Sequence, residues 1–81
     1  MQVQILGTGC AKCQALFANA EQAMQELGIA AEIVKITDLK EIMQFDILLT
    51  PGLAIDGQVK AAGRVLSPAD IKQLLIDAGG K

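Results

Sequence analysis

Two cysteines spaced three residues apart are the side chains in this sequence best suited to chemistry. They are Cys10 and Cys13 in the segment Cys10-Ala11-Lys12-Cys13, and the 81-residue chain has no other cysteine and no histidine. A cysteine thiolate is a nucleophile and a ligand for soft metals. The pair could therefore support thiol–disulfide exchange or bind a soft metal ion.

The position of the pair favours exchange. A short strand signal at 3–6 ends in glycines at positions 7 and 9, and helical spacing of apolar residues follows from about 10 or 11 to 27. Residues i and i+3 of a first helical turn lie about 5–6 Å apart, which suits a disulfide. The helix N-terminus favours a thiolate on Cys10. Cys13 shares the helical stripe of Phe17 and Ala20, so we expect it to be the more buried sulfur.

These differences assign separate roles to the two thiols. We expect Cys10 to attack a substrate disulfide and form a mixed disulfide, which Cys13 then resolves. Zinc usually takes four ligands, so two thiolates alone do not predict a zinc site. A carrier of a soft cation such as Cu(I) is the alternative that uses the same two residues.

The elements that must position the cysteines follow the order β-α-β-α-β-β-α. The expected segments are a strand at 3–6, a helix at 10–27, a strand at 29–36, a short helix capped by Asp38 with Glu41, strands at 53–55 and 59–62 around Asp56-Gly57, and a helix from Ser67-Pro68 to Gly79-Gly80. The first two strands should be parallel. If the third lies antiparallel beside the first, Pro51 meets the cysteines. We expect an α/β fold with a four-stranded mixed sheet flanked by helices.

The composition and charge of the sequence narrow the partners and the cellular compartment that we expect. The net charge is −2 and 52% of residues are hydrophobic, without a basic block, so we expect no nucleic-acid partner. No apolar run approaches the ~20 residues of a membrane span, and the first residues do not resemble a secretory signal. We therefore expect one domain, residues 1–81, in the cytoplasm, without membrane insertion. A permanent disulfide is not expected in that reducing compartment, so a close cysteine pair indicates redox or metal chemistry.

Several segments resemble one known family. The segment from Ile5 to Cys13, the dipeptide Thr50-Pro51 before an apolar strand, and Ile55-Asp56-Gly57 are similar to the small prokaryotic thioredoxin-like "redox-active disulfide" proteins. The resemblance implies a minimal thioredoxin-like fold and a thiol–disulfide oxidoreductase with Cys10 and Cys13 as catalytic residues. It also implies a cis Pro51 facing the disulfide and a Thr50 backbone that binds substrate. Protein disulfide substrates, an upstream reductase similar to thioredoxin reductase, a monomeric state and no cofactor are implied as well.

The sequence departs from thioredoxins at two positions. Gly9 stands where thioredoxins have an aromatic residue, and Gln4 stands where they have a buried aspartate. Gln4 cannot accept a proton, so deprotonation of Cys13 needs water or another group.

Three alternatives, the soft-metal carrier among them, are less consistent with the pattern. The domains that carry heavy metals end in a strand, whereas this sequence ends in a capped helix. A nucleotide-binding glycine loop would need a third glycine where Lys12 stands. A purely structural module would leave the cysteine spacing unexplained.

Overall fold

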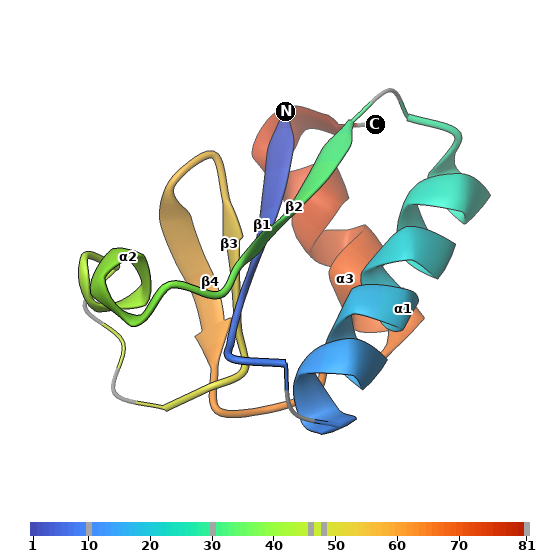
Figure 1. Ribbon diagram of the computed structural model, residues 1–81. Helices are drawn as coiled ribbons and strands as arrows, with labels where there is room; N and C mark the ends of the chain where they lie inside the picture. Colours follow the sequence, from blue (N-terminus) through green and yellow to red (C-terminus); the bar gives the residue numbers. More distant parts are fainter. Residues whose placement is uncertain (10, 30, 46, 48, 81) are drawn as a thin grey trace.

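The fold is a four-stranded sheet with helices on both faces (Figure 1). It is taken from a computed structural model, which describes residues 1–9, 11–29, 31–45, 47 and 49–80. In chain order the elements are β1 (Gln2–Leu6), α1 (Ala11–Leu27), β2 (Glu32–Ile36), α2 (Leu39–Met43), β3 (Gly52–Ile55), β4 (Gln58–Ala62), α3 (Pro68–Leu75) and a π-helical segment (Ile76–Gly80). The expected order β-α-β-α-β-β-α is confirmed.

The sheet order β2-β1-β3-β4 places β1 and β3 at the centre. β1 runs parallel to β2 and antiparallel to β3, and β4 pairs antiparallel with β3. Leu6, the last residue of β1, lies opposite Gly52, the first residue of β3. The predicted arrangement of the third strand is therefore correct, and the segment that precedes β3 reaches the carboxyl end of β1.

The core has two parts because side chains of the central strands alternate between the two faces. Helices α1 and α3 cover one face over a larger cluster that includes Val3, Ile5, Leu16, Leu53 and Ile71 (Figure 1). On the other face α2 covers a small cluster of buried residues, namely Leu6, Ile42 and Ala54. All four residues of β3 are buried, as expected for a strand covered on both sides.

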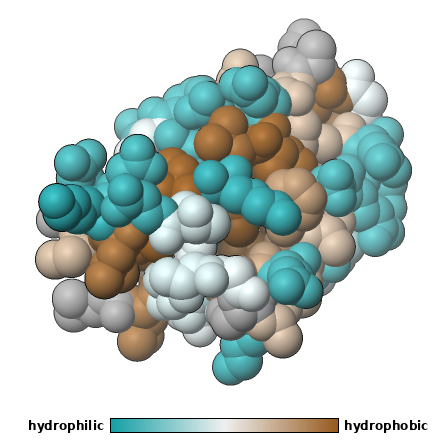
Figure 2. All heavy atoms as spheres, in the orientation of Figure 1, coloured by the Kyte–Doolittle hydropathy of each residue, from teal (hydrophilic) through white to brown (hydrophobic). Residues whose placement is uncertain are grey.

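The edge strand β2 remains partly open. Its side chains are half-buried or exposed, and Figure 2 shows hydrophobic side chains over the middle of this face, where β2 crosses, with hydrophilic ones along the outer side of α1 and over α2. Within the described part of the chain, no helix combines the length and apolarity needed to span a bilayer.

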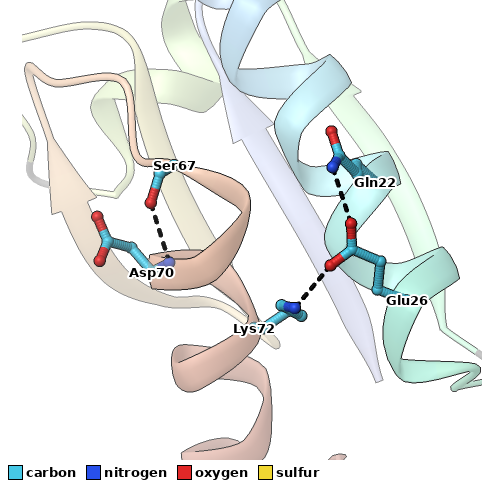
Figure 3. A network of polar contacts seen from close by, with 5 residues as sticks. All are labelled: Gln22, Glu26, Ser67, Asp70 and Lys72. Carbon is cyan, nitrogen blue, oxygen red and sulfur yellow. Dashed lines mark hydrogen bonds and ion pairs between the residues drawn. The ribbon is translucent and has the colours of Figure 1, made fainter.

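Polar contacts fix the start of α3 and join it to α1 (Figure 3). The Ser67 hydroxyl accepts a hydrogen bond from the Asp70 N–H at 3.2 Å, and Pro68 opens the helix, as predicted from their types. Farther along, Lys72 Nζ lies 2.6 Å from Glu26 Oε1, and Gln22 Nε2 donates to Glu26 Oε2 at 2.8 Å. The Lys72–Glu26 ion pair therefore joins α3 to α1, whereas the Gln22 contact lies within α1.

Three local predictions need correction. The second strand begins at Glu32 and not at Ile29, because Ile29 packs against the larger cluster outside the sheet. Asp38 caps α2 as expected, but its side chain accepts from the Lys40 N–H, one residue before the Glu41 N–H that a capping box uses. The last helix widens into the π-helical segment after Leu75, and this wider turn rotates Ala78, predicted to be buried, into solvent.

Candidate functional site

The candidate site lies where β1, α1 and β3 meet. β1 ends at Leu6, and the Gly7 N–H continues the sheet by donating to the Ile36 carbonyl at 3.0 Å. Gly9 then takes a positive φ of 91°, a conformation that favours glycine, and α1 begins at Ala11. The strand and helix signals around the cysteine motif therefore form the expected strand–loop–helix unit.

Cys13 occupies the first turn of α1 and is 5% exposed. It lies on the stripe that continues through Phe17 and Ala20, of which Ala20 is fully buried and Phe17 half-buried. Cys13 is buried, as its place on this stripe predicts, and that it is the more buried of the two sulfurs stays a prediction. Cys10, predicted to be the attacking thiol, lies outside the described residues, so its role stays a prediction.

Gly7 provides the space that the Cys13 sulfur occupies. A Cβ atom built on Gly7 would overlap Cys13 Sγ, and it would lie 3.2 Å from Cys13 Cβ and 3.9 Å from Pro51 Cα. Cys13 and Pro51 thus approach Gly7 together, although they are far apart in sequence. This shows directly the juxtaposition that the strand arrangement predicts.

Thr50 and Pro51 lead into β3 at this end of the sheet. The Thr50–Pro51 peptide bond is cis, as the family resemblance implies. Pro51 is buried, and its carbonyl accepts from the Gly63 N–H at 2.8 Å, whereas Thr50 is exposed. Pro51 is therefore bonded to the residue that follows β4, and the backbone reaches the surface at Thr50.

Two residues of the site were not singled out from the sequence. The sequence predicts Gly7 as part of the turn between strand and helix but not its contact with Cys13, because no sequence signal shows which atom a glycine accommodates. Lys35 lines a pocket of about 140 Å³ beside Cys13, with Ile5, Gln14 and Phe17. The alternation Ile33, Lys35 was a usable signal, because residues i and i+2 of a strand share a face and Ile33 packs against the larger cluster.

Gln4 does not contribute to the space around Cys13. Its side-chain oxygen accepts from the Gly57 N–H at 2.8 Å, and its nitrogen donates to Gln2 at 3.0 Å. Both contacts direct the Gln4 amide toward the hairpin end of the sheet and its own strand. The conclusion that Gln4 is no proton acceptor for Cys13 therefore follows from position as well as residue type.

The strand order, the helical layers and the Cys13–Gly7–Pro51 contact together define a minimal thioredoxin fold. Residues 1–76 match the thioredoxin domain family. The chain is 49% identical over 75 residues to a thioredoxin of Methanothermobacter thermautotrophicus, covering 93% of this chain and 97% of that protein. It is 44% identical over 73 residues to a thioredoxin of Methanocaldococcus jannaschii, covering 90% and 84%. The chain belongs to the thioredoxin domain family, and its activity is that of a thiol–disulfide oxidoreductase.

Proposed function

We propose that Cys10 and Cys13 form the dithiol that carries this activity, with Cys10 as the attacking thiolate and Cys13 as the resolving thiol. The observation that carries the proposal is the burial of Cys13 in the first turn of α1, against Gly7 and near Pro51. A sulfur held there reacts with a neighbouring disulfide more readily than with one in free solution, because its approach is restricted. Cys10 follows from the spacing of the motif.

The proposed reaction has two exchange steps. The Cys10 thiolate attacks one sulfur of the substrate disulfide, and the other substrate sulfur leaves with the bonding electron pair. The Cys13 thiolate then attacks the Cys10 sulfur of this mixed disulfide. The substrate sulfur departs as a thiolate, a Cys10–Cys13 disulfide forms, and the substrate is fully reduced.

The cysteine roles are tested by paired serine substitutions in an insulin-reduction assay. Cys10→Ser should abolish turnover, because no mixed disulfide can form. Cys13→Ser should also stop turnover but accumulate a covalent adduct with insulin that dithiothreitol releases. Turnover of Cys10→Ser at the wild-type rate would reject the assignment.

We further propose that an extended segment of a protein substrate pairs with the backbone of Thr50 while Pro51 packs beside the reacting sulfurs. The exposure of Thr50 and the contact region shared by Pro51, Gly7 and Cys13 support this position. Pro51→Ala should raise KM for insulin more than for a small disulfide such as cystine. Pro68→Ala is the matched control, since Pro68 is the second proline of the sequence and opens α3. Equal KM effects of the two substitutions would reject the substrate-binding role of Pro51.

The proposed setting is a cytoplasmic monomer, one domain over residues 1–81, that acts on protein disulfides and is reduced by an upstream reductase similar to thioredoxin reductase. Nucleic acid is not a proposed partner, because the net charge is −2. A monomer is supported by Lys60, which lies exposed on the edge strand β4 and opposes strand pairing between copies. Sedimentation at micromolar concentration tests the monomer, and reduction coupled to a purified thioredoxin reductase tests the electron donor.

A further inference from the structure

The turn between β3 and β4 contains two neighbouring residues whose groups can react with each other. Asp56 and Gly57 form this turn with φ values of 50° and 87°, and both are exposed. The backbone nitrogen that follows an aspartate can attack the side-chain carboxyl group and close a five-membered succinimide ring. Glycine hinders this attack least because it has no Cβ. The sequence has no second Asp-Gly and no Asn-Gly dipeptide, so this turn is where the reaction should be fastest.

Strand β1 holds both reacting groups of this dipeptide. The Gly57 N–H, whose nitrogen is the nucleophile, donates to Gln4 Oε1 at 2.8 Å. The Asp56 carboxylate accepts from the Gln2 N–H at 2.7 Å, and the Asp56 N–H donates to the Gln2 carbonyl at 2.8 Å. The Gly57 N–H must give up its bond to Gln4 before the nitrogen can attack the carboxyl carbon. Ring closure therefore requires the turn to detach locally from β1.

The Gln4 amide is itself fixed by polar contacts along the sheet. Gln4 and Gln2 lie two residues apart on β1, so their side chains share one face. Gln4 Nε2 donates to Gln2 Oε1 at 3.0 Å, and Gln2 Nε2 donates to Glu32 Oε1 of β2 at 3.1 Å. Gln4 is half-buried. Because its amide nitrogen is bonded within β1, the oxygen of the same amide stays directed at the Gly57 N–H.

We propose that Asp56–Gly57 is a site of spontaneous conversion to isoaspartate, and that Gln4 restrains this conversion by holding the Gly57 N–H. In the first step the Gly57 nitrogen bonds to Asp56 Cγ, and the carboxyl hydroxyl leaves with the amide proton as water. In the second step water opens the succinimide. Attack at Cγ restores aspartate, whereas attack at the main-chain carbonyl leaves Gly57 joined through the side chain as isoaspartate. One water is released and one is consumed, and no group is oxidised or reduced.

The product differs from the original turn in its backbone and in its charged group. Isoaspartate adds one methylene to the main chain and leaves a free α-carboxylate, the group that isoaspartyl methyltransferases methylate. The lengthened turn moves the Gly57 N–H relative to Gln4, so the modified hairpin is held less firmly to β1. The turn lies at the end of the sheet opposite Cys13 (Figure 1). The modification can therefore be followed separately from the redox activity.

Ageing of the purified protein tests the restraint by Gln4. Wild type and Gln4→Leu are incubated at neutral pH below their unfolding transitions, and isoaspartate is counted by methyl transfer with a purified isoaspartyl methyltransferase. Gln4→Leu should form isoaspartate roughly two- to tenfold faster, the factor that corresponds to loss of one hydrogen bond. Gln4→Thr, whose shorter side chain suits a strand, should show the same acceleration and serves if the leucine variant does not fold.

Gln58→Leu is the matched control, because it removes the same kind of amide from the same hairpin. The Gln58 oxygen accepts from Lys60 Nζ at 3.3 Å and not from the Gly57 N–H. This substitution should leave the rate unchanged. Peptide mapping of the aged proteins should place the isoaspartate at Asp56 and not at the other aspartates, which precede leucine, isoleucine or alanine.

Ageing in concentrated urea separates the folded contact from an effect of the sequence. Unfolding removes the bond between Gln4 and Gly57, so wild type and Gln4→Leu should form isoaspartate at the same rate there. A difference that persists in urea overturns the proposal. So does an unchanged rate in folded Gln4→Leu, an equal acceleration in Gln58→Leu, or isoaspartate that maps to another residue.

Discussion

Replacement of Gly7 by alanine tests how closely the chain is fitted around Cys13. The added Cβ would overlap Cys13 Sγ and press on Cys13 Cβ at 3.2 Å. The Gly7 N–H would keep its hydrogen bond to Ile36, since alanine also has this donor. The substitution therefore acts mainly through side-chain volume.

The expected loss can be worked from this overlap. Adding a methyl group to a well-packed site costs about 1–3 kcal/mol of unfolding free energy. For a chain of 81 residues, each kcal/mol corresponds to roughly 4–8 °C in Tm. Gly7→Ala should thus lower Tm by roughly 4–24 °C, measured by circular dichroism. Because the Cys13 sulfur must move, insulin reduction should fall by about tenfold or more even where the protein is fully folded.

A double-mutant cycle separates this overlap from other effects. In a Cys13→Ala background the sulfur is gone, so Gly7→Ala should cost clearly less stability than in the wild type. Gly9→Ala is the comparison for activity, because its Cβ would meet no atom within 4 Å and only the positive φ opposes it. Gly9→Ala should lower the free energy of unfolding. Because Cys13 keeps its position, the folded protein should keep its insulin reduction. If Gly7→Ala costs the same free energy with and without the Cys13 sulfur, the reasoning is refuted.

Three further substitutions test the packing and the polar contacts. The hydrogen bond from Lys72, with that from Gln22, holds the pKa of Glu26 below its ordinary value of 4.5. The contact therefore stabilises the fold above pH 4.5, and this stabilisation is lost as the pH falls through the lowered pKa. Glu26→Gln should therefore lower Tm slightly at neutral pH, and the difference from wild type should vanish in acid; an equal difference at both pH values would contradict this. Ser67→Ala removes the cap of α3 and should cost about 1 kcal/mol in urea unfolding, with no loss of insulin reduction. Leu16→Ala, at a fully buried position, should cost about 2–5 kcal/mol, and a loss under 1 kcal/mol would mean that the larger cluster is loosely packed.

Local sequence signals predicted the elements that depend on a few neighbouring residues. Asp56 and Gly57 both have positive φ, 50° and 87°, as the predicted hairpin turn requires. Ser67 and Pro68 start α3 where their types indicate. The position of Pro51 near the cysteine motif could also be predicted, because it follows directly once β3 is assumed to pair with β1.

Features that depend on packing could not be read from the sequence. Ile29 has a strong strand propensity, yet it contributes to the core from outside the sheet. Ala78 fits the helical stripe, but the change to a π-helical turn alters the direction of its side chain. Gly7 and Lys35 contact residues of other elements. The spacing of residues along the chain does not show which side chains of separate elements come into contact.

The unequal cover of the sheet has a consequence for motion. The face under α2 has a small cluster around Ile42, whereas α1 and α3 together cover the opposite face. The amide protons of α2 should therefore exchange with deuterium well before those of α1 and the central strands, through openings that leave the larger layer intact. Thr50 and Pro51 follow α2 in the chain and join it to the rigid strand β3. In the proposed binding mode, a protein substrate would therefore contact a segment that lies between the more mobile helix α2 and the rigid strand β3.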